Sequence, residues 1–596
     1  MTRLVRPSPG ESRFQKIVGA QGARRRRGIE LVTAAALSLA FALGALPGFV
    51  GHATGHLSPD HQDPLLNLYL MKWGAHQWSL GLADVWNANF FFPTRGALAM
   101  GDHLLGPALA LAAITALGAG AILAFNLILL GALAASPLSL HLLLRRLGCS
   151  WGASLVAALG WGFAAYRVSH ISHAQLLLAL WIPPLLWCFD RFLEKATWTR
   201  AAALCLFYWL HLSGGSYLAY MAHVPLLAIA ILRWREIGTA LRQPARAFRL
   251  LSAALGCAAA VALLYLPYAR LSRDLGIARS IGEWEGFGAR ATSFLAPAKG
   301  TALAFKALAQ FGQPEQQLFP GAVTLLLAAC GLALARPLVR SRMEASLLLG
   351  STACLVLAFP LPFATAAHLL PGLDGMRVPA RFVQLAGLGL ALLAARGLDA
   401  LLLRVRRPAI RGAFLALLCG LLAIELLPSG ARWSALGEEA DFPAVDHWIA
   451  GQSAVRAYVD LPFPPPRRLT REYLAMYLSS LHWKGLVNGR SGYVTSTWRE
   501  IYAAIPVMPD GAALRLLARL GVTHVLARQG AMYEGRSRRE GYLEWTRHFD
   551  RDGMEGLELV YSNGEGDRVY RLIDVSVIQG RSRDPLPENS TLKPWQ

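Results

Sequence analysis

The sequence predicts a polytopic α-helical membrane protein with about eleven transmembrane helices and a C-terminal extracytoplasmic α/β domain. Three observations predict this fold class. Charged residues make up 16% of the 596 residues and hydrophobic residues 54%, whereas soluble proteins carry ~25% charged residues. The mean hydropathy is +0.38. Many apolar runs reach about 16–25 residues, the length that crosses a bilayer core. This composition excludes a soluble enzyme, a disordered chain and a disulfide scaffold.

The net charge of +21 is of the size found in nucleic-acid-binding proteins, but its distribution is different. The basic residues form short clusters between apolar runs, which is what the positive-inside rule produces in cytoplasmic loops. We therefore expect the lipid bilayer, and no nucleic acid, as a partner. The seven cysteines show no CxxC spacing, so neither a disulfide framework nor a zinc site is indicated.

The first apolar run, residues 29–50, follows four consecutive arginines. A cleaved signal peptide begins in the same way, but the run is long and lacks a clear small-residue cleavage site. We therefore expect an uncleaved first helix with residues 1–28 in the cytoplasm. The transmembrane domain is predicted at 29–428, with an outer loop at 51–119. Within that loop, 104–117 is too short for a comfortable span and contains Pro107. Counting it as a span would place every later basic cluster outside, so it is predicted to be interfacial.

Ten further spans follow the outer loop, and their basic connecting loops then all lie on the cytoplasmic side. These spans are predicted at 120–144, 149–166, 174–193, 200–217, 218–233, 250–268, 319–335, 345–363, 380–400 and 412–428. The odd total places residues 429–580 outside, as a small soluble α/β domain. Its predicted strands are 457–461 and 523–527, and 512–520 is predicted to be an amphipathic helix. Residues 581–596 are predicted to be a disordered tail.

The outer loop carries the first candidate catalytic residues, Asp60 and Asp63. Pro64 opens a predicted helix that runs to Trp78, so Asp63 is either an N-terminal capping residue or a functional carboxylate. A carboxylate that is partly desolvated at the membrane surface becomes a stronger base. A divalent metal is left open, because imidazole and carboxylate ligands cluster here without a recognised spacing. The residues concerned are His52, His56, Asp60, His61 and Asp63.

Two other features of the outer side have a structural and a functional interpretation. The aromatic segment 86–93 favours anchoring at the lipid headgroups over substrate stacking. Asp102 is an outer carboxylate that we include among the substrate-binding candidates. After the third span, four polar side chains recur at helical spacing, so they could share one face of a helix. They indicate a polar cavity wall, with interfacial solvation as the alternative. They are Arg167, His170, His173 and Gln175.

Arg377 and Arg381 enter the tenth span from the side that otherwise lacks basic residues. A planar guanidinium suits a phosphate or a carboxylate. Asp374 is the structural candidate for the partner, and a lipid phosphate is the functional candidate that we favour. The intramembrane Gln384 and Asn126 are predicted to form helix–helix hydrogen bonds instead.

The layout resembles the GT-C superfamily of integral-membrane glycosyltransferases, and more narrowly a bacterial group of GT-C-like proteins. The stretches that carry the resemblance are Asp63-Pro64 with its helix, Phe92-Pro93, Gly101-Asp102-His103, 167–175, 377–381 and 473–489. The resemblance implies a bacterial inner-membrane location. It also implies a polyprenyl-phosphate-linked sugar as donor and a glycan, lipid or protein as acceptor.

In that family the first-loop aspartate acts as base on the acceptor or helps to bind a metal. By position this role falls to Asp63, with Asp60 as the fallback. The implied reaction transfers the sugar with inversion to an acceptor hydroxyl on the extracytoplasmic side. Arg377 and Arg381 would stabilise the departing phosphate, and His170, His173 and Gln175 would orient the sugar or acceptor. Two alternatives remain, a lipid or polysaccharide transporter and a non-catalytic assembly protein on the same frame.

Overall fold

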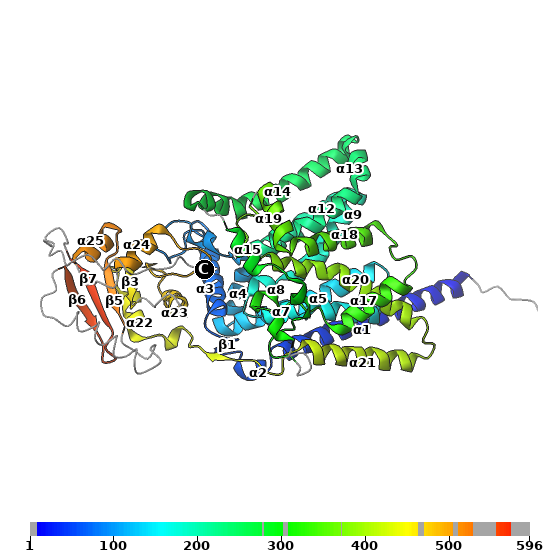
Figure 1. Ribbon diagram of the computed structural model, residues 1–596, viewed down its shortest axis with the longest axis horizontal. Coiled ribbons are helices and arrows are strands. Elements are labelled where there is room, and N and C mark those ends of the chain that lie inside the picture. Colours follow the sequence, from blue (N-terminus) through cyan, green and yellow to red (C-terminus); the bar gives the residue numbers. More distant parts are fainter. Residues whose placement is uncertain are drawn as a thin grey trace, which may run out of the picture.

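The structure is a computed structural model, which describes residues 9–276, 279–301, 308–370, 372–462, 470–504, 511–528 and 556–573. It is elongated, with a helical body at one end of the long axis and a unit containing a β-sheet at the other (Figure 1). The predicted disordered tail 581–596 lies outside the described residues.

Six helical stretches of the described chain are long and apolar enough to cross a membrane. They are Arg27–Ala45 within α1 (Pro9–Ala45), α5 (Ala121–Arg146), Ala174–Glu194, α14 (Pro244–Leu275), Pro379–Leu402 and α21 (Pro408–Leu426). Two bent pairs raise the total to eight if each pair is one span. One pair joins Ser216–Leu232 to α13 (Trp234–Leu241) at 70°, and the other joins α18 (Arg342–Leu357) to α19 (Pro360–Leu369) at 102°.

Several of these stretches are themselves broken into shorter helices. Ala174–Glu194 consists of α8 (Ala174–Leu177), η2 (Ala179–Trp181) and α9 (Ile182–Glu194). Ser216–Leu232 consists of α11 (Ser216–Met221) and α12 (His223–Leu232), and Pro379–Leu402 of η6 (Pro379–Phe382) and α20 (Val383–Leu402).

The predicted total of eleven spans stays a prediction, because three of the predicted spans form helices shorter than the ~20 residues that cross a bilayer. These are α6 (Trp151–Gly162), α10 (Trp198–Leu212) and α17 (Ala322–Leu334), with 12, 15 and 13 residues. Every residue of α6 after Trp151 is buried. The first span also ends earlier than expected, at Ala45, and α2 (Phe49–His52) follows it.

The centre of the helical body is held by close contact between α17 and α20. A Cβ on Gly397 would lie 1.9 Å from the Leu327 carbonyl oxygen, and one on Gly331 would lie 2.1 Å from the Leu393 carbonyl oxygen. Small residues let helix backbones approach this closely, which is how helices associate where no hydrophobic effect drives them together. Gln384 donates to the Leu176 carbonyl oxygen of α8, a hydrogen bond between helices as predicted, whereas Asn126 donates to the carbonyl oxygens of Ala53 and His56, which lie in the segment after α2.

Short helices cover the end of the body that faces the C-terminal unit. They are α3 (Asp63–Ser79), η1 (Ala97–Met100), α4 (Leu105–Ala116), α7 (Ala165–Ser169), α15 (Ile281–Phe287), η3 (Ala291–Leu295), η4 (Ala309–Phe311) and η5 (Pro314–Gln316). The predicted helix from Asp63 is confirmed. The segment predicted to be interfacial forms the 12-residue α4, which packs on α3 and α5.

The C-terminal unit contains a five-stranded sheet in the order β4-β3-β5-β7-β6. Strands β4, β3 and β5 are parallel, whereas β7 and β6 are antiparallel to their neighbours. The elements are η7 (Glu439–Asp441), α22 (Ala444–Gly451), β3 (Ala457–Leu461), α23 (Thr470–Ser479), β4 (Gly485–Leu486), α24 (Ser496–Ala504), α25 (Gly511–Arg519), β5 (His524–Ala527), β6 (Leu557–Ser562) and β7 (Arg568–Leu572).

The predicted strands and the predicted helix of this unit are present as β3, β5 and α25. Every residue of β3 and β5 is buried, so both faces of the sheet are covered at its centre, as is usual for parallel strands. A two-stranded ribbon ties the helical body to the start of this unit, through β1 (His56–Leu57) and β2 (Ser434–Ala435).

The aromatic segment 86–93 is not a headgroup anchor. The Phe92 amide donates to the Leu486 carbonyl oxygen, and the Leu486 amide donates to that of Asn89, so the outer loop pairs with the edge strand β4. Phe90 and Phe91 are each 1% exposed. The aromatic composition of segment 86–93 does not distinguish an interface with lipid from an interface with another part of the chain.

Candidate functional site

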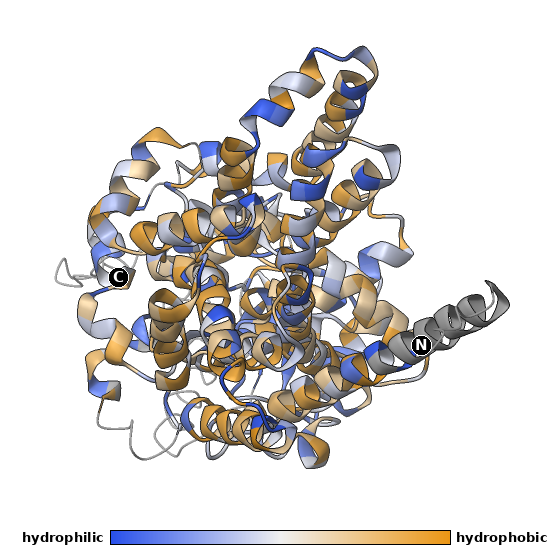
Figure 2. Ribbon diagram, turned by 90° about the vertical axis from the view of Figure 1, so that its right-hand side faces the viewer, coloured by the Kyte–Doolittle hydropathy of each residue, from blue (hydrophilic) through white to orange (hydrophobic). Residues whose placement is uncertain are grey.

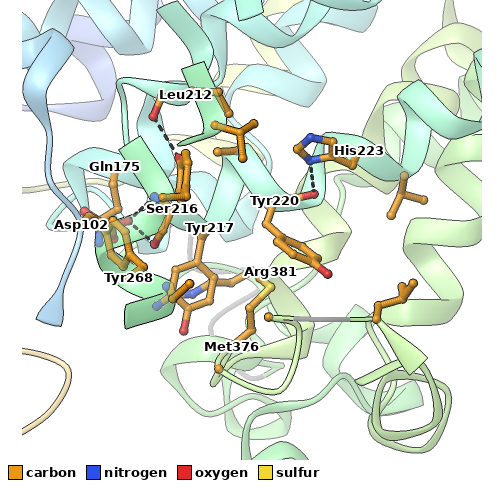
Figure 3. A pocket seen from close by; sticks show the side chains of 18 of the residues that line it. Asp102, Gln175, Leu212, Ser216, Tyr217, Tyr220, His223, Tyr268, Met376 and Arg381 are labelled. Atoms are coloured by element: carbon orange, nitrogen blue, oxygen red, sulfur yellow. Dashed lines mark hydrogen bonds between the residues drawn. The ribbon is translucent and has the colours of Figure 1, made fainter. Parts of the chain in front are cut away.

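One continuous cavity, of about 1950 Å³, lies where the helical body meets the C-terminal unit. It is roughly twice the ~1,000 Å³ at the upper end of ordinary small-molecule sites. Its polar end is lined by residues of α3, the 372–381 loop and the C-terminal unit. An apolar arm continues from there between α14 on one side and α9, α10, α12 and α13 on the other. Figure 3 shows the part of the cavity around Asp102, Tyr217 and Arg381.

Asp63 lies at the polar end, at the first residue of α3. It is not a cap, because the capping position is Gln62 and no side chain bonds to the free amides there. Its Oδ2 atom lies 3.2 Å from Nε2 of His173, and 41% of the side chain is exposed. Desolvation in this enclosed setting, reinforced by the charge of Asp60, raises the pKa of Asp63 in spite of the nearby Arg381. Asp63 is thus positioned to face a ligand as a strengthened base.

Asp60 has a structural partner instead. Its Oδ1 accepts a hydrogen bond from the Gln62 amide at 2.9 Å, which orders the turn that leads into α3. Asp60 does not line the cavity.

The four polar residues after the third span do not share one face. His173 and Gln175 line the cavity, and the Gln175 Oε1 atom is buried without a hydrogen-bond partner. Arg167 and His170 are 1% and 2% exposed and lie behind the wall. The expectation of a shared helical face is wrong because the helix is interrupted: α7 ends at Ser169 and α8 begins at Ala174.

Arg167 stabilises the interrupted helical segment around α7 and α8. Its guanidinium donates to the carbonyl oxygens of Gly162, Leu176 and Leu177, and it lies 5.2 Å from the centre of the Trp161 ring. It satisfies backbone oxygens that the interrupted helices leave open. It is therefore a structural residue and not a part of the cavity wall.

His173 is held neutral at the cavity wall. Burial, with the charges of His170 and Arg381, lowers the pKa of His173 to about 3. Its Nδ1 atom lies 3.1 Å from the Ser172 hydroxyl oxygen. A neutral imidazole beside Asp63 does not neutralise the carboxylate, so Asp63 keeps its capacity to accept a proton.

Glu315 is a central residue of the site that the sequence did not reveal. Its Oε1 accepts from Arg381 at 2.7 Å and its Oε2 lies 2.9 Å from His170 Nε2. Tyr166 donates to the same Oε2 at 3.1 Å. Burial alone raises the pKa of Glu315, but Arg381 and His170 lower it well below its usual range. A glutamate in the long segment between two predicted spans offers no spacing signal, so only the three-dimensional contacts identify it.

Arg377 and Arg381 both line the cavity, as the functional interpretation expected. Arg381 is nearly buried, pairs with Glu315 and lies 4.3 Å from the centre of the Tyr217 ring. The Arg377 side chain is 43% exposed, with its Nε 3.6 Å from Glu283 and its guanidinium 4.4 Å from the Phe287 ring centre. Asp374 is not the partner that the structural interpretation proposed.

Asp102 shapes the cavity wall by fixing the start of α11 (Figure 3). It accepts hydrogen bonds from the amide and the hydroxyl of Ser216. Gly215 precedes this contact with φ of +148°, and a Cβ there would lie 2.9 Å from Asp102 Oδ1. The glycine thus permits both the backbone conformation and the close approach.

The C-terminal unit closes the polar end with residues that sequence reasoning did not place there. Tyr473 of α23, Arg490 and Tyr493 line the cavity. Tyr493 donates to the Gly375 carbonyl oxygen at 2.9 Å, and Arg279 lies 4.2 Å from its ring centre. The motif 473–489 pointed to this region, but nothing in the sequence showed which span it faces.

The proposed metal-binding cluster does not assemble. His52 stacks on Trp433 and lies 4.9 Å from the His56 ring, whereas Asp63 faces His173. Among the described residues, no group of three or more histidine, cysteine and acidic side chains is arranged to hold a metal ion.

No protein-family model matches this sequence. No curated protein matches it either. The structure is similar to the cryo-EM structure of the arabinofuranosyltransferase AftD from Mycobacteria, with a TM-score of 0.54 and 16% identity over 91% of this chain. This chain spans 41% of AftD.

Two other solved structures show a weaker likeness. One is the archaeal oligosaccharyltransferase AglB from Archaeoglobus fulgidus, in complex with an inhibitory peptide and a dolichol-phosphate. The TM-score is 0.46 at 13% identity, and the match covers 83% of this chain and 69% of AglB. The other is ArnT from Cupriavidus metallidurans, with a TM-score of 0.35 and 13% identity. That match covers 94% of this chain and all of ArnT. The structural neighbours are GT-C glycosyltransferases, and the comparison supports that fold for this multi-pass chain.

Proposed function

We propose that this chain is a membrane glycosyltransferase that moves a sugar from a polyprenyl-phosphate donor to an acceptor hydroxyl on the extracytoplasmic side. The observation that carries the proposal is the composition of one cavity. A partly exposed carboxylate, Asp63, and the guanidinium of Arg377 line its polar end, and an apolar arm leads away from them. A ligand with a polar head, an anionic phosphate and a long hydrocarbon tail matches these three parts.

The reaction follows from the positions of the charged groups. Asp63 takes the proton of the acceptor hydroxyl while the acceptor oxygen forms a bond to the anomeric carbon. The bond from that carbon to the phosphate oxygen breaks, and the electron pair leaves with the polyprenyl phosphate. Arg377 and Arg381 stabilise the charge that develops on the phosphate as donors that are already in place. Attack opposite the departing group inverts the anomeric carbon.

Glu315 contributes by positioning. Arg381 is buried, and its ion pair with Glu315 fixes the direction of its guanidinium. A guanidinium that is already oriented needs no reorganisation when the leaving group becomes charged. His170 supports the other carboxylate oxygen of Glu315. His173 and Gln175 remain at the wall, where they contact the sugar or the acceptor.

Replacement of Asp63 by asparagine tests the proposal directly. The variant keeps the shape of the side chain but has no basic carboxylate, so we expect transfer from lipid-linked sugars to fall ~10²–10⁴-fold, the usual contribution of a general base. The assay incubates membranes of a strain lacking the gene, complemented with either form, with radiolabelled lipid-linked sugars. Transfer is measured as label in glycan, lipid or protein.

Asp60→Asn is the matched comparison, because Asp60 lies three residues away but outside the cavity and raises the pKa of Asp63 by its charge; the variant should retain most of the activity at neutral pH and move the acidic limb to lower pH. The raised pKa of Asp63 adds a second readout, since the base form is lost as pH falls through that pKa. The acidic limb of kcat/KM should lie above the ~3.9 of an ordinary aspartate. Normal transfer by Asp63→Asn would remove the base from the mechanism, and substrate movement across vesicles without bond cleavage would favour a transporter.

A further inference from the structure

The apolar arm of the cavity is continuous along almost the whole of α14. The residues of α14 that line it recur every three or four positions, so they form one face of the helix. Examples are Ala247, Leu250, Ala254, Cys257, Val261 and Tyr265. From Ala247 to Ser272 this face extends about 38 Å along the helix axis, at about 1.5 Å per residue.

The length of the arm is comparable with the full thickness of a membrane. The hydrocarbon core of a bilayer is roughly 30 Å thick, and a tilted helix of this length still covers most of it. The far end of the arm is lined by Leu193 of α9 and by Ile237 and Leu241 of α13. Arg233 and Arg242 flank α13 at that end. The arm therefore runs from the polar end of the cavity to the basic end of the helices.

α14 is packed against the rest of the protein over only a small part of its surface. In the 18-residue apolar window of α14, only 17% of the residues are buried. Its principal contacts are with α10, α13 and η1, whereas α9 and α12 line the far side of the cavity. The helices α13 and α14 project away from the rest of the helical body in both overall views (Figures 1 and 2).

We propose that this arm measures the length of the donor lipid, so that the site selects polyprenyl chains long enough to cross both leaflets. The inference rests on the proposed function and narrows its donor class. The arginines at the polar end fix the phosphate, and the apolar face of α14 then fixes the depth that the tail must reach. A short isoprenoid or an acyl chain confined to one leaflet fills only the first part of the arm.

The expected affinity differences are moderate, for a physical reason. The tail leaves lipid and not water, so it gains packing contacts without a hydrophobic driving force. Deep occupancy should therefore change the affinity by about three- to tenfold rather than by orders of magnitude. The affinity should increase with the length of the polyprenyl chain, up to the length that fills the apolar arm.

The test uses polyprenyl phosphates without a sugar, so that binding is measured independently of transfer. Geranyl, heptaprenyl and undecaprenyl phosphate compete with radiolabelled undecaprenyl phosphate for the full-length protein in nanodiscs of fixed lipid content. The readout is the ratio of affinities of the long and the short probes within each variant. Differences in partitioning between probes are the same for every variant and cancel in the comparison.

Tryptophan substitutions at three positions of α14 show which part of the cavity makes the affinity depend on chain length. Ala247→Trp obstructs the far end and should lower the undecaprenyl-to-heptaprenyl ratio about three- to tenfold. Ala254→Trp obstructs the middle and should lower both long-chain affinities relative to geranyl phosphate. Ala259→Trp is the matched control, because Ala259 is exposed on α14 and does not line the cavity. Size-exclusion profiles and thermal unfolding establish that each variant is folded.

The outcomes separate the two proposals. Unchanged ratios in both obstructing variants, or an equal loss in Ala259→Trp, would overturn the length measurement. Affinity ratios of the wild-type protein that are no higher than those of Ala254→Trp would also overturn it, while leaving the donor class intact. Failure to bind any polyprenyl phosphate would contradict the proposed donor itself. A length-dependent ratio without detectable transfer would support the inference and count against the glycosyltransferase reaction alone.

Discussion

Two regions of this molecule bring charged residues together, and they do so in opposite ways. In the C-terminal unit, Arg528 donates to both oxygens of Asp446 at 2.6 and 2.7 Å and to Asp460 at 2.7 Å, and all three side chains are at most 2% exposed. At the polar end of the cavity, the side chains of Asp63 and Arg377 are 41% and 43% exposed. The first network is closed within the protein, whereas the second leaves its groups facing a cavity.

The difference indicates which buried charges are structural and which are free to act. A closed network that satisfies its donors and acceptors internally adds rigidity and order. Groups that keep an open side can exchange solvent for a ligand, and their pKa values respond to that environment. The comparison yields three predictions, two for buried charges of the C-terminal unit and one for the open end of the cavity.

The largest effect is expected from Arg528→Leu. Removing Arg528 leaves the Asp446 carboxylate buried without its ion-pair partner, whereas Asp460 keeps its ion pair with Arg471, and the loss costs about 3–5 kcal/mol. The unfolding of the C-terminal unit, measured by urea titration of the purified protein with limited proteolysis, should shift by that amount. A shift below 1 kcal/mol would show that this network is not closed in solution.

A smaller effect is expected from Glu472→Gln in the same unit. Glu472 is buried and accepts hydrogen bonds from the Gly489 amide and Asn488, and desolvation raises its pKa to about 7. A carboxyl whose pKa is raised on folding stabilises the protein fully only below its unfolded pKa. That stability is lost as pH rises through the unfolded value toward about 7.

The glutamine variant has no charge to bury, so it should remove this pH dependence. We expect it to be more stable than the wild type at pH 8, by on the order of 1–3 kcal/mol, and nearly equal to it at pH 4. Denaturant midpoints at the two pH values provide the measurement. Parallel pH profiles for the two proteins would contradict the assignment.

The smallest change in stability is expected from Arg377→Leu, at the open network. Its contact with Glu283 is long and partly exposed, so its loss should cost about 0–1 kcal/mol. Binding of geranyl phosphate should nevertheless weaken about tenfold, as expected for a charged hydrogen-bond donor at a phosphate. A stability loss as large as that of Arg528→Leu, with unchanged phosphate binding, would place Arg377 with the structural charges.

The elements that the sequence predicted well are those whose signals are local. The pair Asp63-Pro64 begins α3 because proline suits the first helical turn, and β3, β5 and α25 lie where their patterns placed them. Asp63 and Arg377 also line the cavity. Each lies at the start of a helical element that the sequence predicted, α3 for Asp63 and the span beginning at η6 for Arg377.

The features that the sequence did not predict depend on contacts between distant segments. Glu315 becomes a site residue only because His170 and Arg381 fold against it from two other elements. Arg167 and His170 were assigned to one face by a periodicity that holds only within an uninterrupted helix. Apolarity does not fix the number of spans for a related reason, since it marks α6 equally well whether its neighbours are lipid or other helices.

The pairing of the outer loop with strand β4 has a consequence for biosynthesis. The segment 89–92 leaves the ribosome long before residues 485–488, which complete its backbone hydrogen bonds. The wall around Asp63 is thus finished only when the last quarter of the chain has been synthesised and folded. A truncated product would present both an unpaired backbone edge and two uncovered phenylalanines, and such an edge pairs readily with other chains.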